Sequence, residues 1–323
     1  MSSNFEYPGK IGLAPMAGIT SRPFRKICSL WGAEFSYTEM ISAESVLRAF
    51  KVVQKMLPDE EEKNVAVQLF GNDPNRMAQA AKVVEPFACW ININAACPAK
   101  KVLKKGSGGA LLKDLERLKA IISAVKNAVQ RPVTVKVRIG FEENELEKIM
   151  QVCIDAGADG VEVHGRTVEQ GYGGKAIWDL KLDQYEVATV ISGDIYEPQD
   201  VEKALSISGA QAVLIARGAL RKPWIFAQLK GKNPTVEEIK NMFLLHLKML
   251  IDLEGPRSFY KLRQFVAGYT HGMPGARMFR ERFMLANSPE EQQQLINEFF
   301  NQLLMNNQEN EVVKPIEELS KEV

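Results

Sequence analysis

The chain has 323 residues, 46% of them hydrophobic and 25% charged, a composition typical of a globular protein with a sizeable core. Because 41 Lys and Arg residues nearly balance 40 Asp and Glu residues, the net charge indicates no polyanionic partner, and any nucleic-acid surface must come from local clustering. The N-terminal residues lack a signal-peptide pattern, and no apolar run approaches the ~18 residues that span a membrane. We therefore expect a cytoplasmic protein outside membranes.

Short apolar runs recur along the first two thirds of the chain, and several are unbroken, as in parallel strands covered on both faces. The expected strands are Ile11–Pro15, Phe35–Glu39, Val65–Phe70, Trp90–Asn94, Val133–Arg138, Gly160–His164, Val187–Ser192 and Ala212–Arg217. Helical patterns lie between them at Pro23–Leu30, Pro74–Val84, Leu115–Val129, Glu145–Ala156 and Pro198–Ser206. Eight such alternations predict an α/β fold, a (β/α)₈ TIM barrel. A doubly wound open sheet is the alternative, but its Gly-x-Gly-x-x-Gly fingerprint is missing after the first strand.

The pattern changes near Gly231, and beyond it only helical patterns remain. These are Val236–Leu253, Ser258–Ala267, Ala276–Leu285 and Pro289–Met305. We expect a barrel domain over residues 1–232 and a small C-terminal helical domain over residues 233–323. The residues around 306–311 are expected to be loose.

Charge is unevenly distributed within the helical domain. Residues 255–282 carry six Arg or Lys and one acid, whereas residues 287–323 carry eight acids and two lysines. Aromatic residues are interleaved with the basic ones, among them Tyr260, Phe265, Tyr269 and Phe279. Basic residues with aromatics suit phosphate contact and base stacking, although solvated helix faces give the same pattern.

Four cysteines occur without a C-x-x-C pair, and only three histidines accompany them. These spacings predict neither a disulfide scaffold nor a metal site. We expect Cys28, Cys89 and Cys153 to be buried small side chains. Cys97 is different, because it follows directly on the apolar run Trp90–Asn94, at the carboxyl end of a strand where α/β folds carry out chemistry. A thiol can act there as nucleophile, metal ligand or proton donor, and no nearby histidine is spaced to make it a thiolate.

Two segments of small residues follow the seventh and eighth expected strands, namely Ser192-Gly193-Asp194 and Ala216-Arg217-Gly218-Ala219. TIM barrels commonly bind a phosphate between the loops after these strands, where the backbone approaches the anion closely. Each segment alone also fits an ordinary glycine turn. Together, at these two positions, they favour a phosphate-bearing ligand.

Three polar residues lie in or at the ends of other strands: Gln68, Lys136 and His164. Their donors and positive charge suit the edge of a flavin ring, which becomes anionic on reduction. A Gln or His at a strand end also fits a structural hydrogen bond. A lysine inside an apolar run is harder to explain without a partner for its charge.

An ordered set of segments resembles the bacterial tRNA-dihydrouridine synthases. The segments are Ala14–Gly18, Val67–Gly71, Asn94–Pro98, Gly108–Leu111, Val135–Arg138, His164–Thr167, Ser192–Ile195, Ala216–Ala219, Leu262-Arg263 and Ala267–Tyr269. Each segment alone is weak, but the ordered set covers essentially the whole barrel and is specific.

The resemblance implies an FMN-dependent oxidoreductase that reduces the C5=C6 bond of selected uridines in tRNA. Hydride would come from reduced FMN, recharged by NADPH or NADH, and the proton from Cys97. By position, Asn94 would hydrogen-bond the target uracil, with Arg138 and Arg166 near the substrate or cofactor. The implied FMN contacts are Pro15, Met16, Ala17, Gln68, Lys136, His164, Ser192, Gly193, Asp194, Ala216 and Arg217. We expect a monomer.

Four positions depart from the family pattern. Asn92 stands where Asp is usual, Ala96 and Ala216 where Gly is usual, and Ser192 where Asn is usual. None removes a group that performs chemistry. Ala96 disfavours a positive φ and so bears on the geometry of the cysteine loop.

Two other functions fit parts of the sequence. A small-molecule FMN oxidoreductase of the dihydroorotate or enoate type would share the barrel but would not require the basic helical domain. A tRNA-binding folding factor with a vestigial flavin site would not require Cys97, Lys136 and His164. Flipping a base out of folded tRNA demands contacts elsewhere, which the basic segment and Lys100, Lys101, Lys104 and Lys105 could supply.

Overall fold

The first part of the chain forms a closed barrel of eight parallel strands, seen in a computed structural model that describes residues 5–312. The strands are β1 (Ile11–Leu13), β2 (Phe35–Tyr37), β4 (Val65–Phe70), β5 (Trp90–Ala95), β6 (Val133–Arg138), β7 (Gly160–His164), β8 (Ala188–Ser192) and β9 (Ala212–Ile215). The pairings β2–β4 and β1–β9 close the barrel, and the two-residue β3 (Ile41–Ser42) adds to the end of β4. The predicted TIM barrel is confirmed.

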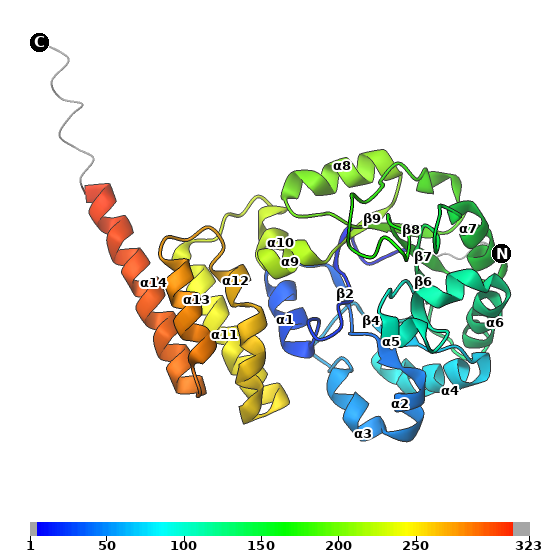
Figure 1. The fold of residues 1–323 in the computed structure, drawn as a ribbon, viewed down its shortest axis with the longest axis horizontal. Helices are drawn as coiled ribbons and strands as arrows, with labels where there is room; N and C mark the ends of the chain where they lie inside the picture. The colour runs from blue at the N-terminus through cyan, green and yellow to red at the C-terminus, as the bar shows by residue number, and fades with distance from the viewer. Residues whose placement is uncertain (1–4, 313–323) are drawn as a thin grey trace, which may run out of the picture. The chain divides into compact units, whose positions relative to one another are not determined.

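Helices surround the strands, and α4, α6, α7 and α8 form the outer layer in Figure 1. The helices of this part are α1 (Arg22–Leu30), α2 (Ala43–Arg48), α3 (Phe50–Val53), α4 (Pro74–Val84), α5 (Lys100–Leu103), α6 (Leu115–Lys126), α7 (Leu146–Asp155), α8 (Pro198–Ser208) and α9 (Arg217–Arg221). Asp73 caps α4 by accepting from the backbone N–H of Arg76, and Glu197 caps α8 in a capping box. Gly209 ends α8 with a left-handed backbone.

Aromatic side chains fill the amino-terminal end of the barrel. Tyr7, Phe35, Tyr37 and Trp90 pack with ring centroids 5.6–6.3 Å apart. Because successive side chains of a strand alternate between its two faces, the residues that follow on the same inner face, such as Asn92 and Asn94, lead toward the carboxyl end. The barrel is therefore apolar at its base and polar at its mouth.

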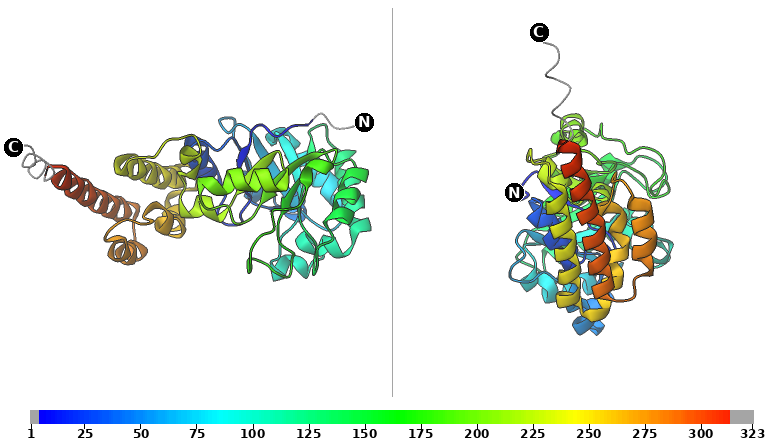
Figure 2. Two further views of the ribbon diagram at one scale, coloured as in Figure 1. Left: turned by 90° about the horizontal axis from the view of Figure 1, so that it is seen from above. Right: turned by 90° about the vertical axis from the view of Figure 1, so that its left-hand side faces the viewer.

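The second part of the chain is helical. Contacts divide the chain into a unit ending at Ala219 and a unit beginning at Leu220. The second unit contains α10 (Ile225–Gln228), α11 (Val236–Glu254), α12 (Val266–Tyr269), α13 (Ala276–Leu285) and α14 (Pro289–Val312). Figure 2 shows α11, α13 and α14 side by side. The assignment of FMN binding to residues 1–232 and tRNA binding to residues 233–323 stays a prediction.

The helical pattern at Ser258–Ala267 is borne out, because residues 256–264 form a 3-10 helix and α12 follows. The Ser258 hydroxyl donates to the carbonyls of Leu250 and Gly255 at the start of this helix. Two expectations for the helical unit are wrong. Residues 306–311 are not loose, because no Gly or Pro interrupts α14 before Val312. The aromatics Phe265, Tyr269 and Phe279 are buried, since this small unit needs them for its core, and cannot stack on bases; Tyr260 is exposed.

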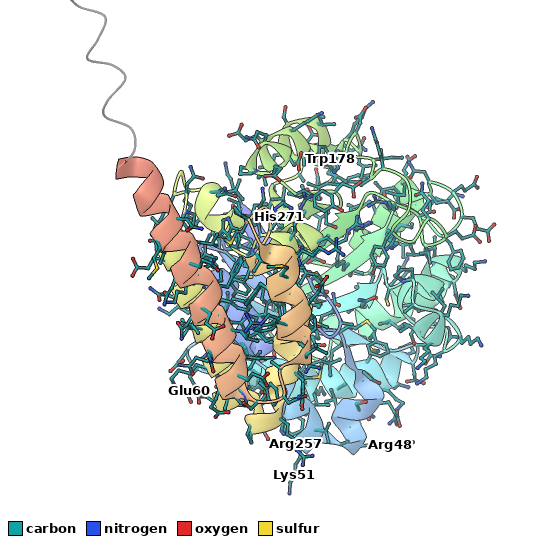
Figure 3. The ribbon with its side chains drawn as sticks, turned by 60° about the vertical axis from the view of Figure 1, so that its left-hand side comes forward. Arg48, Lys51, Glu60, Trp178, Arg257 and His271 are labelled. Atoms are coloured by element: carbon teal, nitrogen blue, oxygen red, sulfur yellow. The ribbon has the colours of Figure 1, made fainter. Side chains whose placement is uncertain are left out.

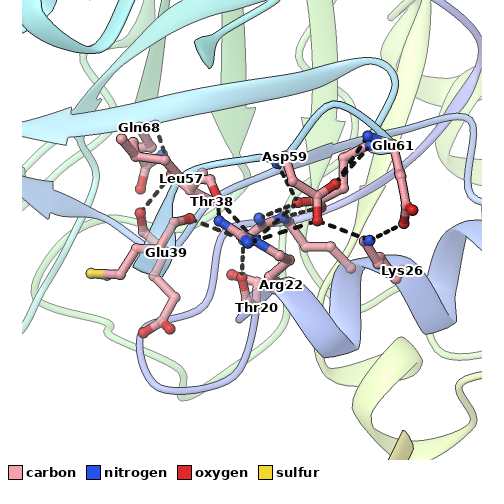
Figure 4. Close-up of polar contacts among 12 residues, drawn as sticks. Thr20, Arg22, Lys26, Thr38, Glu39, Leu57, Asp59, Glu61 and Gln68 are labelled. Carbon is pink, nitrogen blue, oxygen red and sulfur yellow. Dashed lines mark hydrogen bonds and ion pairs between the residues drawn. The ribbon is translucent and has the colours of Figure 1, made fainter. Parts of the chain in front are cut away.

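A buried ion pair ties α1 to the segment that precedes β4. The Arg25 guanidinium donates to both carboxylate oxygens of Glu62 at 2.8 Å, and the two side chains are 1% and 3% exposed. Arg22 and Lys26 extend this contact to Asp59, and Lys26 also reaches Glu61 (Figure 4). Since these groups bridge segments on both sides of β2 and β3, they hold this sector of the barrel wall together.

The Glu62→Ala variant should lower the free energy of unfolding by about 3–5 kcal/mol, because it leaves the Arg25 charge buried without its partner. Urea unfolding followed by tryptophan fluorescence measures this loss. The control is Glu61→Ala, whose side chain is 83% exposed and should contribute less than about 1 kcal/mol. Equal stability of the two variants would contradict a structural role for the pair.

Candidate active site

A cavity of about 500 Å³ opens at the carboxyl ends of the barrel strands. Every site residue expected from the sequence lines it except Arg166. The lining carries three cationic side chains, Lys136, Arg138 and Arg217, and a single acid, Asp194. This charge balance suits an anionic ligand. Among residues 5–312, no group of three or more His, Cys, Asp or Glu is arranged to hold a metal.

Cys97 lies two residues beyond β5, half-buried in the wall of this cavity. The Asn94 side-chain oxygen accepts the backbone N–H groups of Ala96 and Cys97 at 3.2 and 3.0 Å, which fixes the turn that carries the thiol. Burial raises the pKa of the Cys97 thiol above its usual value of 9.0, against the lowering effects of the Ala99 backbone and Arg138. The thiol is therefore protonated at neutral pH.

Two glycines let a second loop approach the cysteine. The Gly109 N–H donates to the Cys97 carbonyl at 3.0 Å. A Cβ on Gly108 would lie 3.0 Å from the Cys97 Cβ, and φ at Gly108 is +61°. On the other side, the Ala96 carbonyl accepts from Arg138 at 2.8 Å. Ala96 does not need the positive φ that a glycine would provide, so this departure leaves the loop intact.

Burial favours the neutral form of both Lys136 and His164. Burial lowers the pKa of Lys136 to about 8, and the Lys136 ammonium donates to the Ser192 hydroxyl at 3.0 Å. Ser192 thus supplies the acceptor at a position where the family pattern has Asn. Burial lowers the pKa of His164 to about 2, with Lys136 and Arg138 adding to the effect. At neutral pH the cavity presents a mainly cationic Lys136 and a neutral imidazole.

Asp194 organises two arginines beside the cavity. Arg166 reaches its carboxylate at 2.6 and 2.7 Å, and Arg217 at 2.9 Å. These bonds hold the pKa of Asp194 below its ordinary value, although burial opposes them. Arg166 is 1% exposed and also donates to the carbonyls of Gly173 and Gly174. Its position indicates a structural clamp, and its expected contact with substrate or cofactor stays a prediction.

Tyr172 is a residue of the cavity that the sequence did not single out. Its ring is 63% exposed and lies 5.6 Å from the Arg138 guanidinium and 5.7 Å from that of Arg217. The loop around it is anchored, because Arg138 donates to the Gly171 carbonyl at 2.7 Å. An aromatic residue inside the glycine-rich stretch Gly171–Gly174, after the carboxyl end of β7, was the available signal.

Gln68 and Asn94 meet below the mouth. The Asn94 amide donates to the Gln68 side-chain oxygen at 2.8 Å, and the Gln68 amide donates to Asn92 at 2.7 Å. Asn92 donates in turn to the Glu162 carboxylate at 2.7 Å. An Asp at position 92 would therefore bring two carboxylates within hydrogen-bond distance, which explains the departure from the family pattern. No sequence motif indicates that these side chains form one hydrogen-bonded chain.

The remaining cysteines are separate from the site. Cys28 and Cys153 are buried as expected, and burial raises the pKa of both thiols, that of Cys153 to about 12. The expectation that Cys89 is buried is wrong, because it lies in the short connection before β5 and is exposed. Cys89 therefore serves as an internal reference for thiol reactivity.

Comparisons with known proteins identify the family of the chain. A family model described as Dihydrouridine synthase (Dus) matches residues 12–304. The chain is 33% identical to tRNA-dihydrouridine synthase B of Pasteurella multocida (strain Pm70), covering 95% of this chain and 97% of that one. It is 34% identical to tRNA-dihydrouridine synthase B of Escherichia coli (strain K12), with 92% and 97% covered, and 35% identical to that of Shewanella oneidensis, with 94% and 98% covered.

A solved structure shares the barrel. The crystal structure of DHODH in complex with ferulenol from Eimeria tenella superimposes with a TM-score of 0.51 at 18% identity, covering 73% of this chain and 82% of that chain. At this identity the likeness concerns the fold alone.

Alkylation of Cys97 should be slow at neutral pH and should accelerate as the pH rises beyond about 9, because only the thiolate reacts and burial raises the pKa of this thiol. Iodoacetamide labelling across this range, resolved by peptide mass spectrometry, measures the rate with Cys89 as the exposed reference. A rate that levels off below about pH 8 would show a thiolate at neutral pH and contradict the protonated state.

Proposed function

The chain belongs to the dihydrouridine synthase family, as the order of its motifs predicts, and we propose that Cys97 is the proton donor in reduction of a tRNA uridine to dihydrouridine. The family is one of flavin-dependent oxidoreductases. The observation that carries the proposal is a half-buried thiol, protonated at neutral pH, in the wall of a cationic cavity at the carboxyl ends of the barrel strands. We propose FMN as the flavin and NADPH or NADH as its reductant.

The cavity suits FMN in charge and size. Lys136 and the neutral His164 would contact the electron-rich edge of the ring, with Gln68 beside them. The phosphate would lie near Ser192, Gly193 and the N-terminal turn of α9, where Arg217 supplies positive charge. The first strand contributes its end, Pro15, Met16 and Ala17, to the same cavity. Asp194 would act there mainly by holding Arg217 in place.

The chemistry divides between the cofactor and the protein. When bound, reduced FMN supplies hydride to C6 of the uracil. Cys97 donates its proton to C5, the C5=C6 double bond becomes a single bond, and the thiolate takes its next proton from solvent. Asn94, held by Gln68, orients the base, and the exposed ring of Tyr172 offers a surface on which a flipped base can stack. Arg138 couples both loops by bonding Ala96 and Gly171.

Exposed cations support tRNA as the substrate. Lys100, Lys101, Lys104 and Lys105 follow Cys97 directly and are all exposed. In the helical unit Arg257 (labelled in Figure 3) and Arg277 are exposed. A small substrate would need neither group, which argues against a dihydroorotate- or enoate-type reductase. No described helix is long and apolar enough to cross a membrane; cytoplasmic location and a monomeric state stay predictions.

Cys97→Ala should abolish dihydrouridine formation while flavin binding and reduction persist. The variant should purify yellow and release FMN on denaturation, and NADPH should bleach it as it does the unmodified protein. Addition of undermodified tRNA should then fail to reoxidise the flavin, with a rate loss of about 100-fold or more, the contribution of a positioned general acid. Cys89→Ala is the matched control. Full retained activity of Cys97→Ala would remove the thiol from the mechanism.

Replacing Arg257 and Arg277 by Ala should weaken tRNA binding and lower the slope of log K against log salt by about 2, one for each lost phosphate contact. The rate of flavin reduction by NADPH should stay unchanged. Lys248→Ala, an exposed lysine of α11 outside residues 255–282, is the control. An unaltered salt slope in the double variant would place the RNA surface elsewhere.

A further inference from the structure

A carboxylate lies in the middle of the barrel, below the cavity and outside the proposed chemistry. Glu162, in β7, is 0% exposed. One of its oxygens accepts the hydroxyls of Tyr7 and Tyr37 at 2.9 and 2.7 Å, and the other accepts the Asn92 amide at 2.7 Å. A buried charge of this kind is costly unless it is fully hydrogen-bonded, so its presence at the centre of the fold calls for a role.

A chain of side-chain amides leads from this carboxylate to the cysteine loop. The Asn92 oxygen accepts from Gln68 at 2.7 Å, and the Gln68 oxygen accepts from Asn94 at 2.8 Å. The Asn94 oxygen accepts the backbone N–H groups of Ala96 and Cys97. Three strands, β4, β5 and β7, contribute to a chain that runs from the barrel centre to its mouth.

The carboxylate fixes the direction of the whole chain. A carboxamide can turn either its oxygen or its amide group toward a neighbour, but a carboxylate only accepts. Asn92 must therefore donate its amide to Glu162 and accept from Gln68 with its oxygen. Gln68 then accepts from the Asn94 amide, which leaves the Asn94 oxygen to face the cysteine loop. The reverse direction would place the Asn94 amide against the N–H groups of Ala96 and Cys97, where two donors would face each other. The correct direction is the one that holds the loop.

We propose that Glu162 is a positioning residue that sets the donor and acceptor direction of Asn92, Gln68 and Asn94 and thereby holds the Cys97 loop in place. This inference rests on the proposed function only for its consequence in catalysis. The hydrogen-bond chain itself is present in the folded barrel whatever reaction the protein catalyses. It also fixes the orientation of the Asn94 side chain, because its oxygen and its amide both have partners in the chain.

Glu162 acts on a second group of the site through its charge. Lys136 is its register neighbour on β6, and the Glu162 carboxylate partly offsets the burial that lowers the pKa of Lys136. The other titratable groups that face this carboxylate are Tyr7 and Tyr37, whose pKa values burial and Glu162 both raise. The Glu162 charge also adds to the effect of burial in raising the pKa of Cys153 on α7. The carboxylate thus keeps a cation at the mouth without itself lining the cavity.

An exchange of residues between two strands tests the direction directly. In Asn92→Asp/Glu162→Gln the carboxylate moves to position 92, where it can still only accept from Gln68. The chain keeps its direction and the barrel keeps its charge. In Glu162→Gln alone the backbone N–H groups of Ala96 and Cys97 still favour this direction, but no acceptor-only group enforces it at the barrel centre, so the reverse direction becomes populated. The single and double variants therefore differ in whether a carboxylate enforces the hydrogen-bond direction, although both contain the Glu162→Gln change.

The rate at which iodoacetamide alkylates Cys97, in protein without tRNA, measures how firmly the Cys97 loop is held and does not depend on turnover. Glu162→Gln should be alkylated about tenfold faster, the factor that corresponds to roughly one lost hydrogen bond. The exchanged double variant should return to within about twofold of the unmodified protein, since the coupling between neighbours cancels the single effects. Flavin reoxidation by tRNA should fall and recover in the same order.

Tyr7→Phe is the matched control, because it removes one donor from the same carboxylate and leaves the amide chain unchanged. It should lower the urea midpoint without accelerating Cys97 alkylation. If Glu162→Gln cannot be recovered folded, Asn92→Ala interrupts the chain and must reproduce the faster alkylation. The proposal is overturned if Glu162→Gln, or Asn92→Ala in its place, reacts like Tyr7→Phe, or if the exchange fails to restore the rate. An active Cys97→Ala enzyme would instead overturn the proposed function and leave this comparison valid.

Discussion

In a closed parallel sheet every second side chain of each strand points toward the barrel axis. Water cannot reach the hydrogen-bonding groups of polar side chains there. In β6 the valines at 133, 135 and 137 are fully buried against the outer layer, and Thr134, Lys136 and Arg138 alternate with them. Because the axis is narrow, polar residues of neighbouring strands must satisfy one another. The polar core and the walls of the cavity are therefore connected by hydrogen bonds. Among the described residues, Glu162 is the only acid of this system that is 0% exposed.

The same burial sets the protonation states that a reductase of this kind requires. It raises the pKa of the Cys97 thiol, lowers that of Lys136 to about 8 and lowers that of His164 to about 2. Removing water penalises the charged form of each group, whichever its sign. One physical cause thus yields a protonated thiol, a neutral imidazole and a lysine that remains mainly cationic at neutral pH, all in the wall of one cavity.

The sequence predicted the barrel well, because unbroken Val and Ile runs and the glycines between them are local signals. It also placed most cavity residues, since polar residues at strand ends converge in any such barrel, as Lys136 and His164 do. It did not predict that Phe265, Tyr269 and Phe279 are core residues, because a basic neighbourhood hides their burial. Nor did it predict the hydrogen bond between Asn92 and Glu162, which are 70 residues apart. This bond depends on the register of the strands and on which side chains point inward, and no local sequence pattern reveals either.

The depth at which the negative charges lie accounts for the cationic character of the mouth. A free carboxylate in the cavity wall would repel an anionic ligand, and Asp194, the single acid that lines it, is neutralised by Arg166 and Arg217. The Glu162 charge lies deeper, where it steadies Lys136 and dictates hydrogen-bond direction. The neutral side chains of Asn92, Gln68 and Asn94 then extend the hydrogen-bond direction to the cavity mouth, and none of them bears a charge. The loop of Cys97 is thereby held by an anion that does not itself line the cavity.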